Sequence, residues 1–293
     1  MAARRHSGLI AVTGATGGVG GRVARRLAES GVVQRLVVRD PGRAPRLIGA
    51  QVVWGGSLGE GDQFTRALEG VDTLFLVSAE EAADRVARHT AAVDSAVAAG
   101  VSRIVYLSLL GAAPDATFTF ARDHHATEEH IRSTGLAFTF LRPSLYAEML
   151  PRMMGSSGAL AGPAGDGRVS WVSRDDVAAV ATAVLSGDAH DGQTYDVTGP
   201  ESRGFASAAD ELARRVGRPI VYVGESVAEA YASRAAYGAP RFEVDGWVTS
   251  YLAVAAGDFD VVSDSVPRLT GRASQTLPEY LDAHPEDWAH LRR

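Results

Sequence analysis

The chain has 293 residues, of which 46% are hydrophobic and 22% charged, the size and composition of a globular protein. Its net charge of −6 argues against a broad basic surface for nucleic acid, and the lack of cysteine excludes disulfides, thiolate zinc sites and cysteine nucleophiles. No apolar run approaches the roughly 18 residues that span a bilayer, and the apolar stretch near the N-terminus is too short for a signal peptide. We expect a cytoplasmic protein that binds neither nucleic acid nor membranes.

Short apolar strands and helices alternate through the first 143 residues. Strand-like runs cover residues 8–14, 34–40, 51–56, 72–79, 103–111 and 136–144. Helical patterns cover residues 18–31, 61–70, 82–100 and 119–135. Because buried strands joined through helices form parallel sheets covered on both faces, this order predicts an α/β fold with a doubly wound Rossmann sheet.

The pattern is less regular after residue 143. Residues 155–167 are rich in Gly, Ser, Ala and Pro and are expected to form a loop. The elements expected after it are a short strand over 168–173, a helix over 174–187, a strand over 193–200, a helix over 206–217, a strand over 219–226 and a mostly helical remainder. We expect a dinucleotide-binding core over residues 1–150 and a smaller α/β substrate lobe over 151–293, with some segments of the lobe returning to the core.

A glycine-rich turn joins the first strand to the first helix. Gly14 allows the tight turn, Gly17 lets the backbone approach a pyrophosphate, and Gly20 lets the helix pack against the sheet. The first helical turn then presents free N–H groups and the positive end of its dipole to the anion. This context predicts dinucleotide binding through Gly14, Thr16, Gly17, Gly18, Val19 and Gly20.

The end of the second strand bears on the choice of dinucleotide. NAD sites usually place Asp or Glu there to accept a hydrogen bond from the ribose 2′-OH. Here Arg39 ends the strand and Arg43 follows it, and a guanidinium can pair with the 2′-phosphate of NADP. Asp40 could serve NAD instead, and a solvated surface position is the alternative for Arg43. We predict NADP(H) as the cofactor, with NAD(H) as the alternative.

Further candidate contacts lie where later strands end, because ligands of wound sheets bind beyond the carboxyl ends of the strands. Val77 and Ser78 end the fourth strand and are expected near the nicotinamide ribose. Ser108 ends the fifth strand, where it could meet the cofactor or cap the strand. Ser144 and Tyr146 follow the sixth strand and are placed to line a substrate pocket, with core packing as the alternative for Tyr146.

Several segments together resemble the NmrA-like family of atypical short-chain dehydrogenases, which includes NADPH-dependent quinone oxidoreductases. They are VTGATGGVGGRVARRL, VVRDPGRAPRL, IVYLSLLGA, HHATEEHIRSTGLAFTFLRPSLYAEML and SRDDVAAVATAVL. The resemblance covers most of the chain. It implies either reduction of quinones and related compounds or binding of a dinucleotide by a regulator without turnover, and it does not specify the substrate.

The chain departs from the catalytic pattern of the main short-chain dehydrogenases. Their Tyr-x-x-x-Lys pair is impossible here, because all 29 basic residues are arginine. The resemblance places Arg122 where similar proteins carry lysine, and Arg122 can bind an anion but cannot exchange protons at neutral pH. It places His124 where a histidine can donate to a substrate oxygen, with a helix-surface position as the alternative. Glu128 and Glu129 are expected to be charges on the face of the helix, and Gly56 stands where a family carboxylate would approach adenine.

The predicted function is an NADPH-dependent oxidoreductase that transfers hydride to a quinone-like or other flat unsaturated small molecule. The predicted catalytic residues are His124 and Tyr146, and Arg122, Ser144 and Tyr146 are expected to line the substrate pocket. The scattered histidines predict no metal site. The alternatives are a non-catalytic NAD(P)-sensing regulator with a protein partner, and a biosynthetic tailoring enzyme on the same fold.

Overall fold

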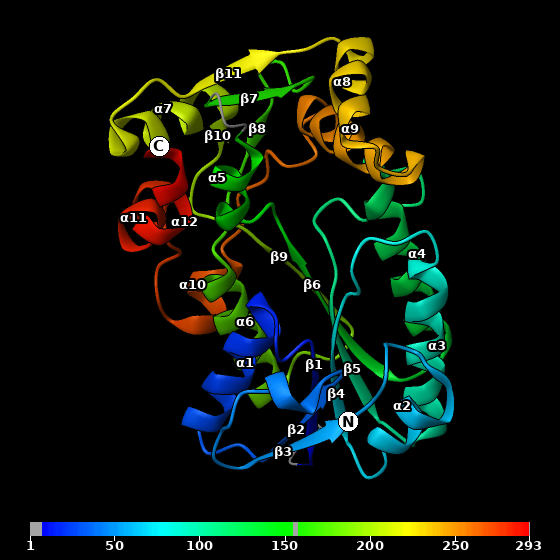
Figure 1. Ribbon diagram of the computed structural model, residues 1–293. Coiled ribbons are helices and arrows are strands. Elements are labelled where there is room, and N and C mark those ends of the chain that lie inside the picture. Colours follow the sequence, from blue (N-terminus) through cyan, green and yellow to red (C-terminus); the bar gives the residue numbers. More distant parts are fainter. Residues whose placement is uncertain (1–7, 155–157, 293) are drawn as a thin grey trace.

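A parallel sheet of seven strands forms the centre of the computed structural model, which describes residues 8–154 and 158–292. From edge to edge its strands are β3 (Ala50–Trp54), β2 (Gln34–Val38), β1 (Ile10–Thr13), β4 (Thr73–Val77), β5 (Arg103–Leu107), β6 (Ala137–Pro143) and β9 (Gln193–Val197) (Figure 1). The strand order reverses direction between β1 and β4, which is where wound sheets bind their ligands. The predicted Rossmann sheet is confirmed.

Helices cover both faces of this sheet (Figure 1). One face carries α1 (Gly18–Glu29), α6 (Arg174–Ser186) and α10 (Ser265–Thr270), and the other carries α2 (Gly61–Ala67), α3 (Arg85–Ala98) and α4 (Thr119–Ser133). Fully buried aliphatic side chains, among them Val23 of α1 and Val180 of α6, fill the first interface. The central strands β1, β4 and β5 are buried on both faces, whereas the edge strand β3 is largely exposed.

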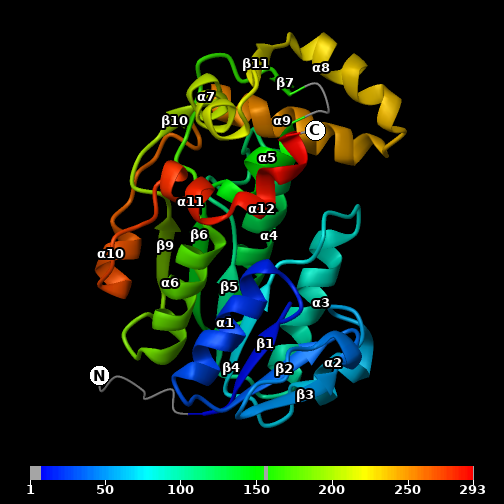
Figure 2. The same cartoon turned by 60° about the vertical axis from the view of Figure 1, so that its left-hand side comes forward.

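A smaller lobe lies beyond the carboxyl edge of the sheet, as Figures 1 and 2 show. The chain enters it from β6 through two short helical segments, η2 (Ala147–Met149) and α5 (Leu150–Met153). In the lobe β7 (Ala159–Gly162) pairs with β11 (Val221–Gly224) and β8 (Arg168–Val169) pairs with β10 (Arg203–Gly204). Its helices are α7 (Phe205–Val216), α8 (Val227–Arg234), α9 (Arg241–Ala255), α11 (Leu277–Ala283) and α12 (Pro285–Trp288). The intervening α6, β9 and α10 pack on the core instead.

The loop predicted over residues 155–167 is wrong over its middle part, because β7 occupies Ala159–Gly162. Leu160 is fully buried in the core of the lobe. At Gly162 a Cβ would lie 2.3 Å from the ring of Tyr251, so the small residues that indicate a loop here allow close packing in a strand. Residues 155–157 of the predicted loop and residues 1–7 of the N-terminal segment lie outside the described residues.

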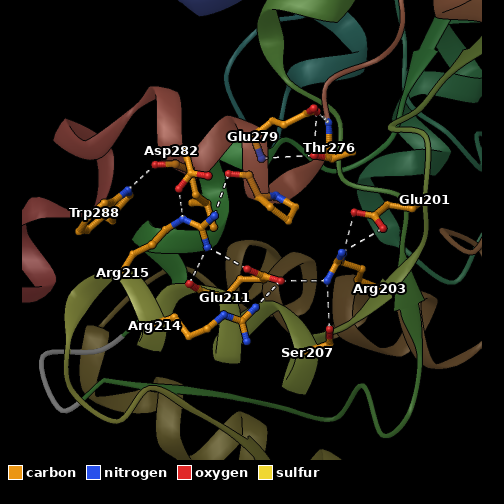
Figure 3. A network of polar contacts seen from close by, with 12 residues as sticks. Glu201, Arg203, Ser207, Glu211, Arg214, Arg215, Thr276, Glu279, Asp282 and Trp288 are labelled. Atoms are coloured by element: carbon orange, nitrogen blue, oxygen red, sulfur yellow. Dashed lines mark hydrogen bonds and ion pairs between the residues drawn. The ribbon is translucent and has the colours of Figure 1, made fainter.

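A cluster of charged side chains holds the lobe together around Glu211 of α7 (Figure 3). This carboxylate forms ion pairs with Arg203 at 3.2 Å, with Arg215 at 2.8 Å and also with Arg214. Arg215 reaches onward to Asp282 of α11 at 2.7 Å, so the cluster ties two helices together. Burial acts to raise the pKa of Glu211, but the hydrogen bonds from Arg215 and Arg214 outweigh it and lower that pKa.

Within the part of the chain that the structure describes, no helix is long and apolar enough to cross a bilayer. Over the same residues, no three His, Asp or Glu side chains come together in a way that could hold a metal ion.

Candidate active site

The glycine turn after β1 is built for a closely approaching ligand. Gly14 has a φ of +63°, a conformation that L side chains rarely adopt. A Cβ on Gly20 would lie 2.4 Å from the carbonyl oxygen of Gly14, so only glycine lets α1 pack this tightly against the strand end. The N-cap of α1 is Gly17, whose side-chain-free position leaves the first N–H groups of the helix open. The residues present therefore fit a pyrophosphate.

A groove of about 380 Å³ runs from this turn along the carboxyl edge of the sheet. It is lined by Thr13, Gly14, Thr16, Gly17, Gly18, Val19, Gly20, Val37, Val38, Arg39, Arg43, Gly56, Ser57, Leu58, Phe64, Val77, Ser78, Ala79, Glu80 and Arg88. The structure thus brings together every residue that the sequence predicts to bind cofactor, except Ser108.

The contacts of Asp40 and Arg39, after the end of β2, bear on the choice between NAD and NADP. The Asp40 carboxylate caps the short helix η1 (Pro41–Arg43) by accepting the Gly42 N–H at 2.9 Å. Arg39 instead lines the groove and pairs with Glu80 at 2.9 Å, with both side chains more than half exposed. The residues that line the groove include Arg39 and not Asp40.

Buried side chains hydrogen-bond to the peptide group of Ala79, which forms part of the groove wall. Its N–H donates to Nε2 of His89 at 2.8 Å, and its carbonyl accepts from Nε of Arg85 at 3.1 Å. Burial, aided by the Arg85 charge, lowers the pKa of His89 to about 3, so the ring is neutral. Its Nδ1–H therefore donates to Thr127 at 2.9 Å, and the groove wall is fixed to α3 and α4.

His124 belongs to the same buried cluster and is 5% exposed. Arg85 can only donate, so Nε2 of His124 accepts from it at 3.1 Å, and Nδ1 contacts the Tyr106 hydroxyl at 2.9 Å. Burial and then the Arg85 charge lower the pKa of His124 well below its usual value. With both ring nitrogens engaged inside the protein, His124 presents no free donor to the groove. Its catalytic role stays a prediction that these contacts do not favour.

Glu128 is not the helix-face charge that the sequence predicts, since it is fully buried. Arg142 of β6 binds it with two hydrogen bonds of 2.8 and 2.6 Å, and Ser108 donates to it at 2.6 Å. Ser108 thus ties the end of β5 to α4 rather than lining the groove. Glu129, the next residue, is exposed and pairs with Arg132, as expected of a surface charge.

The residues expected to line a substrate pocket lie apart from one another. Arg122 is exposed on α4, and its Nε donates to the Ala116 carbonyl at 2.7 Å. Ser144 is buried and accepts from Ser170 at 3.1 Å. Tyr146 is half-buried and packs on the α1 and α6 side, whereas His124 lies on the α3 and α4 side. The structure therefore does not gather His124 and Tyr146 into one cluster.

The sequence reasoning missed several groove residues, among them Leu58, Phe64, Ala79, Glu80 and Arg88. Glu80 and Ala79 directly follow Val77 and Ser78, so extending the prediction past the end of β4 would have found them. Phe64 and Arg88 reach the groove from α2 and α3, and no motif in the sequence marks them.

Comparison with known proteins accords with this geometry. The NAD(P)H-binding family matches residues 14–188, which include the glycine turn, all groove residues but Thr13, and the start of the lobe. The chain belongs to this family. It is 33% identical over 281 residues to NAD(P)H azoreductase of Xenophilus azovorans, covering 94% of this chain and 98% of the relative.

Solved structures agree with the sequence comparison. The NADPH-dependent quinone oxidoreductase of Escherichia coli in complex with NADPH superimposes with a TM-score of 0.84 at 31% identity, covering 94% of this chain and 99% of that one. The negative transcriptional regulator NmrA in complex with NADP shares the fold, with a TM-score of 0.74 at 18% identity and coverage of 96% and 99%. The predicted class, an NAD(P)H-dependent oxidoreductase of the atypical short-chain dehydrogenase type, is confirmed.

Proposed function

We propose that this protein is an NADPH-dependent oxidoreductase that transfers hydride to a quinone-like or other flat unsaturated small molecule. The observation that carries the proposal is the groove, with a glycine turn at one end and the guanidinium groups of Arg39 and Arg43 at the other. The relatives support it, because one is an NAD(P)H azoreductase and another a quinone oxidoreductase. When bound, the dinucleotide supplies the hydride.

In this proposal the groove residues bind and orient. The turn from Gly14 to Gly20 holds the pyrophosphate, and Arg39 and Arg43 hold the 2′-phosphate, which makes the cofactor NADP(H). Val77 and Ser78 form the wall at the nicotinamide ribose. The core over 1–150 binds the cofactor, and the lobe over 151–293 forms the substrate side of the site, where a small-molecule acceptor binds. We also place the enzyme in the cytoplasm, which cell fractionation would test.

Tyr146 is the side chain that we propose to face the acceptor. Burial raises its pKa although the Arg174 charge opposes this, so the phenol stays protonated and can donate a hydrogen bond to a developing oxyanion. No lysine is available to lower that pKa. This arrangement suits a quinone, whose reduced form is a stabilised oxyanion, better than a simple ketone.

The proposal is tested with purified protein, NADPH and a panel of quinones and azo dyes, following the loss of NADPH absorbance. We expect turnover of at least one acceptor and a fall in kcat for Tyr146→Phe. Tight NADPH binding without turnover of any acceptor would contradict the proposal. That result would favour the NAD(P)-sensing regulator instead.

A further inference from the structure

One arginine beside the glycine turn has no hydrogen-bond or ion-pair partner for its guanidinium within the described part of the chain. Arg174 is the first residue of α6, and its side chain lies across Gly18, the first residue of α1. A Cβ on Gly18 would lie 2.7 Å from Cδ and 3.0 Å from Nε of Arg174. Gly18 lines the cofactor groove, so the Arg174 guanidinium lies beside the helix N-terminus that the groove exposes.

The side chain of Arg174 stacks on Tyr146. Arg174 is half-buried, and its Cζ lies 4.9 Å from the centre of the Tyr146 ring. Across residues 8–154 and 158–292, its guanidinium makes no hydrogen bond or ion pair; only its backbone N–H has a partner, Glu148 Oε1 at 3.0 Å. The neighbouring Arg26 and Arg272, by contrast, both bind Asp175 or Asp176. A guanidinium stacked in place with free donors is preorganised for an anion.

A structural role for Arg174 would come through its stacking on Tyr146 or through Glu148. That carboxyl group is 4% exposed, and its Oε2 has no hydrogen-bond partner among the described residues. Burial raises the pKa of Glu148, while the backbone hydrogen bonds and the Arg174 charge act against the rise. Balancing this buried carboxyl group is therefore the competing explanation for the arginine.

We propose that Arg174 is a cofactor-binding residue that donates to the pyrophosphate from the α6 side of the glycine turn. The inference rests on the proposed function for the identity of the ligand, a dinucleotide. The turn supplies backbone N–H groups and a helix dipole, and Arg174 adds the full positive charge that the turn itself lacks. Tyr146 holds the guanidinium in position by stacking, so the side chain proposed to face the acceptor contacts the one proposed to bind the pyrophosphate.

This role differs from that of Arg39 in a measurable way. The pyrophosphate is common to NADPH and NADH, whereas the 2′-phosphate is present only in NADPH. We expect Arg174→Gln to weaken both dinucleotides by the same factor, about tenfold, since a charge-assisted hydrogen bond is lost. The matched control, Arg39→Met, weakens NADPH alone. Adenosine 2′-monophosphate, which lacks the pyrophosphate, should bind Arg174→Gln and the unmodified protein equally.

The measurement is the dissociation constant of each ligand by calorimetry at fixed ionic strength, with the unfolding midpoint in urea recorded for every variant. Unchanged affinities with a lower midpoint would overturn the proposal, because Arg174 would then only balance Glu148. Unchanged affinities with a raised KM for an anionic acceptor would overturn it as well. Because binding is measured without turnover, a failure of the proposed function shows separately as a lack of reduction.

A second variant keeps the test decisive if Arg174→Gln does not fold. Gly18→Ala places a Cβ against Arg174 and must displace it, without removing its charge. We expect this variant to weaken NADPH and NADH equally. Where Arg174→Gln does fold, the effect of Gly18→Ala should vanish in its background. An effect of Gly18→Ala that is the same in both backgrounds would contradict the proposal.

Discussion

Arginines gather in two regions of this protein, and they differ in what they contact. In the lobe, Arg203, Arg214 and Arg215 all bind the Glu211 carboxylate, and two of them reach a further acidic residue. Around the groove, Arg174 has no acidic partner among the described residues, and Arg39 and Arg88 pair with the exposed Glu80 and Asp84. Since the chain has no lysine, both regions use the same cation. The paired guanidinium groups of the lobe link its elements to one another, whereas Arg174 and Arg39 are the arginines that we propose to bind the cofactor.

The largest effect should come from removing the centre of the satisfied cluster. Glu211→Ala leaves three arginines without their common carboxylate, although Arg203 keeps Glu201 and Arg215 keeps Asp282. Breaking a buried ion pair by removing one partner costs about 3 kcal/mol in the free energy of unfolding. Urea denaturation measures that loss, and the affinity for NADPH at a temperature where the variant is folded should not change. A loss of NADPH affinity in this variant would show that the Glu211 cluster also supports cofactor binding, and would contradict the comparison between the lobe and the groove.

A somewhat smaller effect is expected from the groove. Arg39→Met removes a charge-assisted contact to the 2′-phosphate, so the NADPH affinity should fall by about 10- to 100-fold. The NADH affinity and the urea midpoint should stay as they are, because the side chain is 66% exposed and its pair with Glu80 holds no structure. Equal loss for both cofactors would show that Arg39 does not read the 2′-phosphate.

Acid should affect the lobe through Glu211. Its pKa is lowered in the folded state, so its contribution to stability is present above the unfolded-state pKa of about 4.3 and is lost as the pH falls through the lower folded-state value. The gap in free energy of unfolding between the unmodified protein and Glu211→Gln should therefore narrow below about pH 4. Urea titrations from pH 7 to pH 3 measure this gap. A gap independent of pH would mean that the charge on Glu211 is not what the arginines bind.

The smallest effect concerns Glu80, the carboxylate that pairs with Arg39 in the groove. Glu80→Gln frees Arg39 and removes a negative charge beside the 2′-phosphate, so the NADPH affinity should rise by about two- to fivefold at low salt. The gain should disappear at high ionic strength, and the NADH affinity should not move. Weaker NADPH binding in this variant would make Glu80 a ligand of the cofactor rather than a competitor.

Much of this organisation is local and could be predicted from the sequence. The strand, turn and helix around Gly14 follow one another within a few residues, so the whole predicted pyrophosphate site lies in one short segment. The same holds for Arg39 at the tip of β2. The fold followed because each strand of the core carries its own apolar run.

What could not be predicted depends on contacts between distant segments. Glu128 and Glu129 are adjacent and look alike, and Arg142 of β6 determines which of them is buried. The sequence predicts that His124 is a hydrogen-bond donor to substrate. In the structure it is surrounded by His89, Arg85 and Tyr106, and the last two contact its ring nitrogens. Arg174 reaches the glycine turn only because α6 packs against α1, although the two helices lie far apart in the sequence.

The position of β9 has a consequence for the way this protein is made. β9 pairs with β6, and α6 lies along α1, yet both follow the first segments of the lobe in the chain. While the chain is being synthesised, the edge of β6 therefore stays unpaired until residues 193–197 have left the ribosome, and an open apolar edge is a template for another chain. A fragment ending at residue 150 would keep the whole glycine turn but lack the strand that closes the sheet. Such a fragment should aggregate, and the nucleotide-binding half is best produced only as part of the full chain.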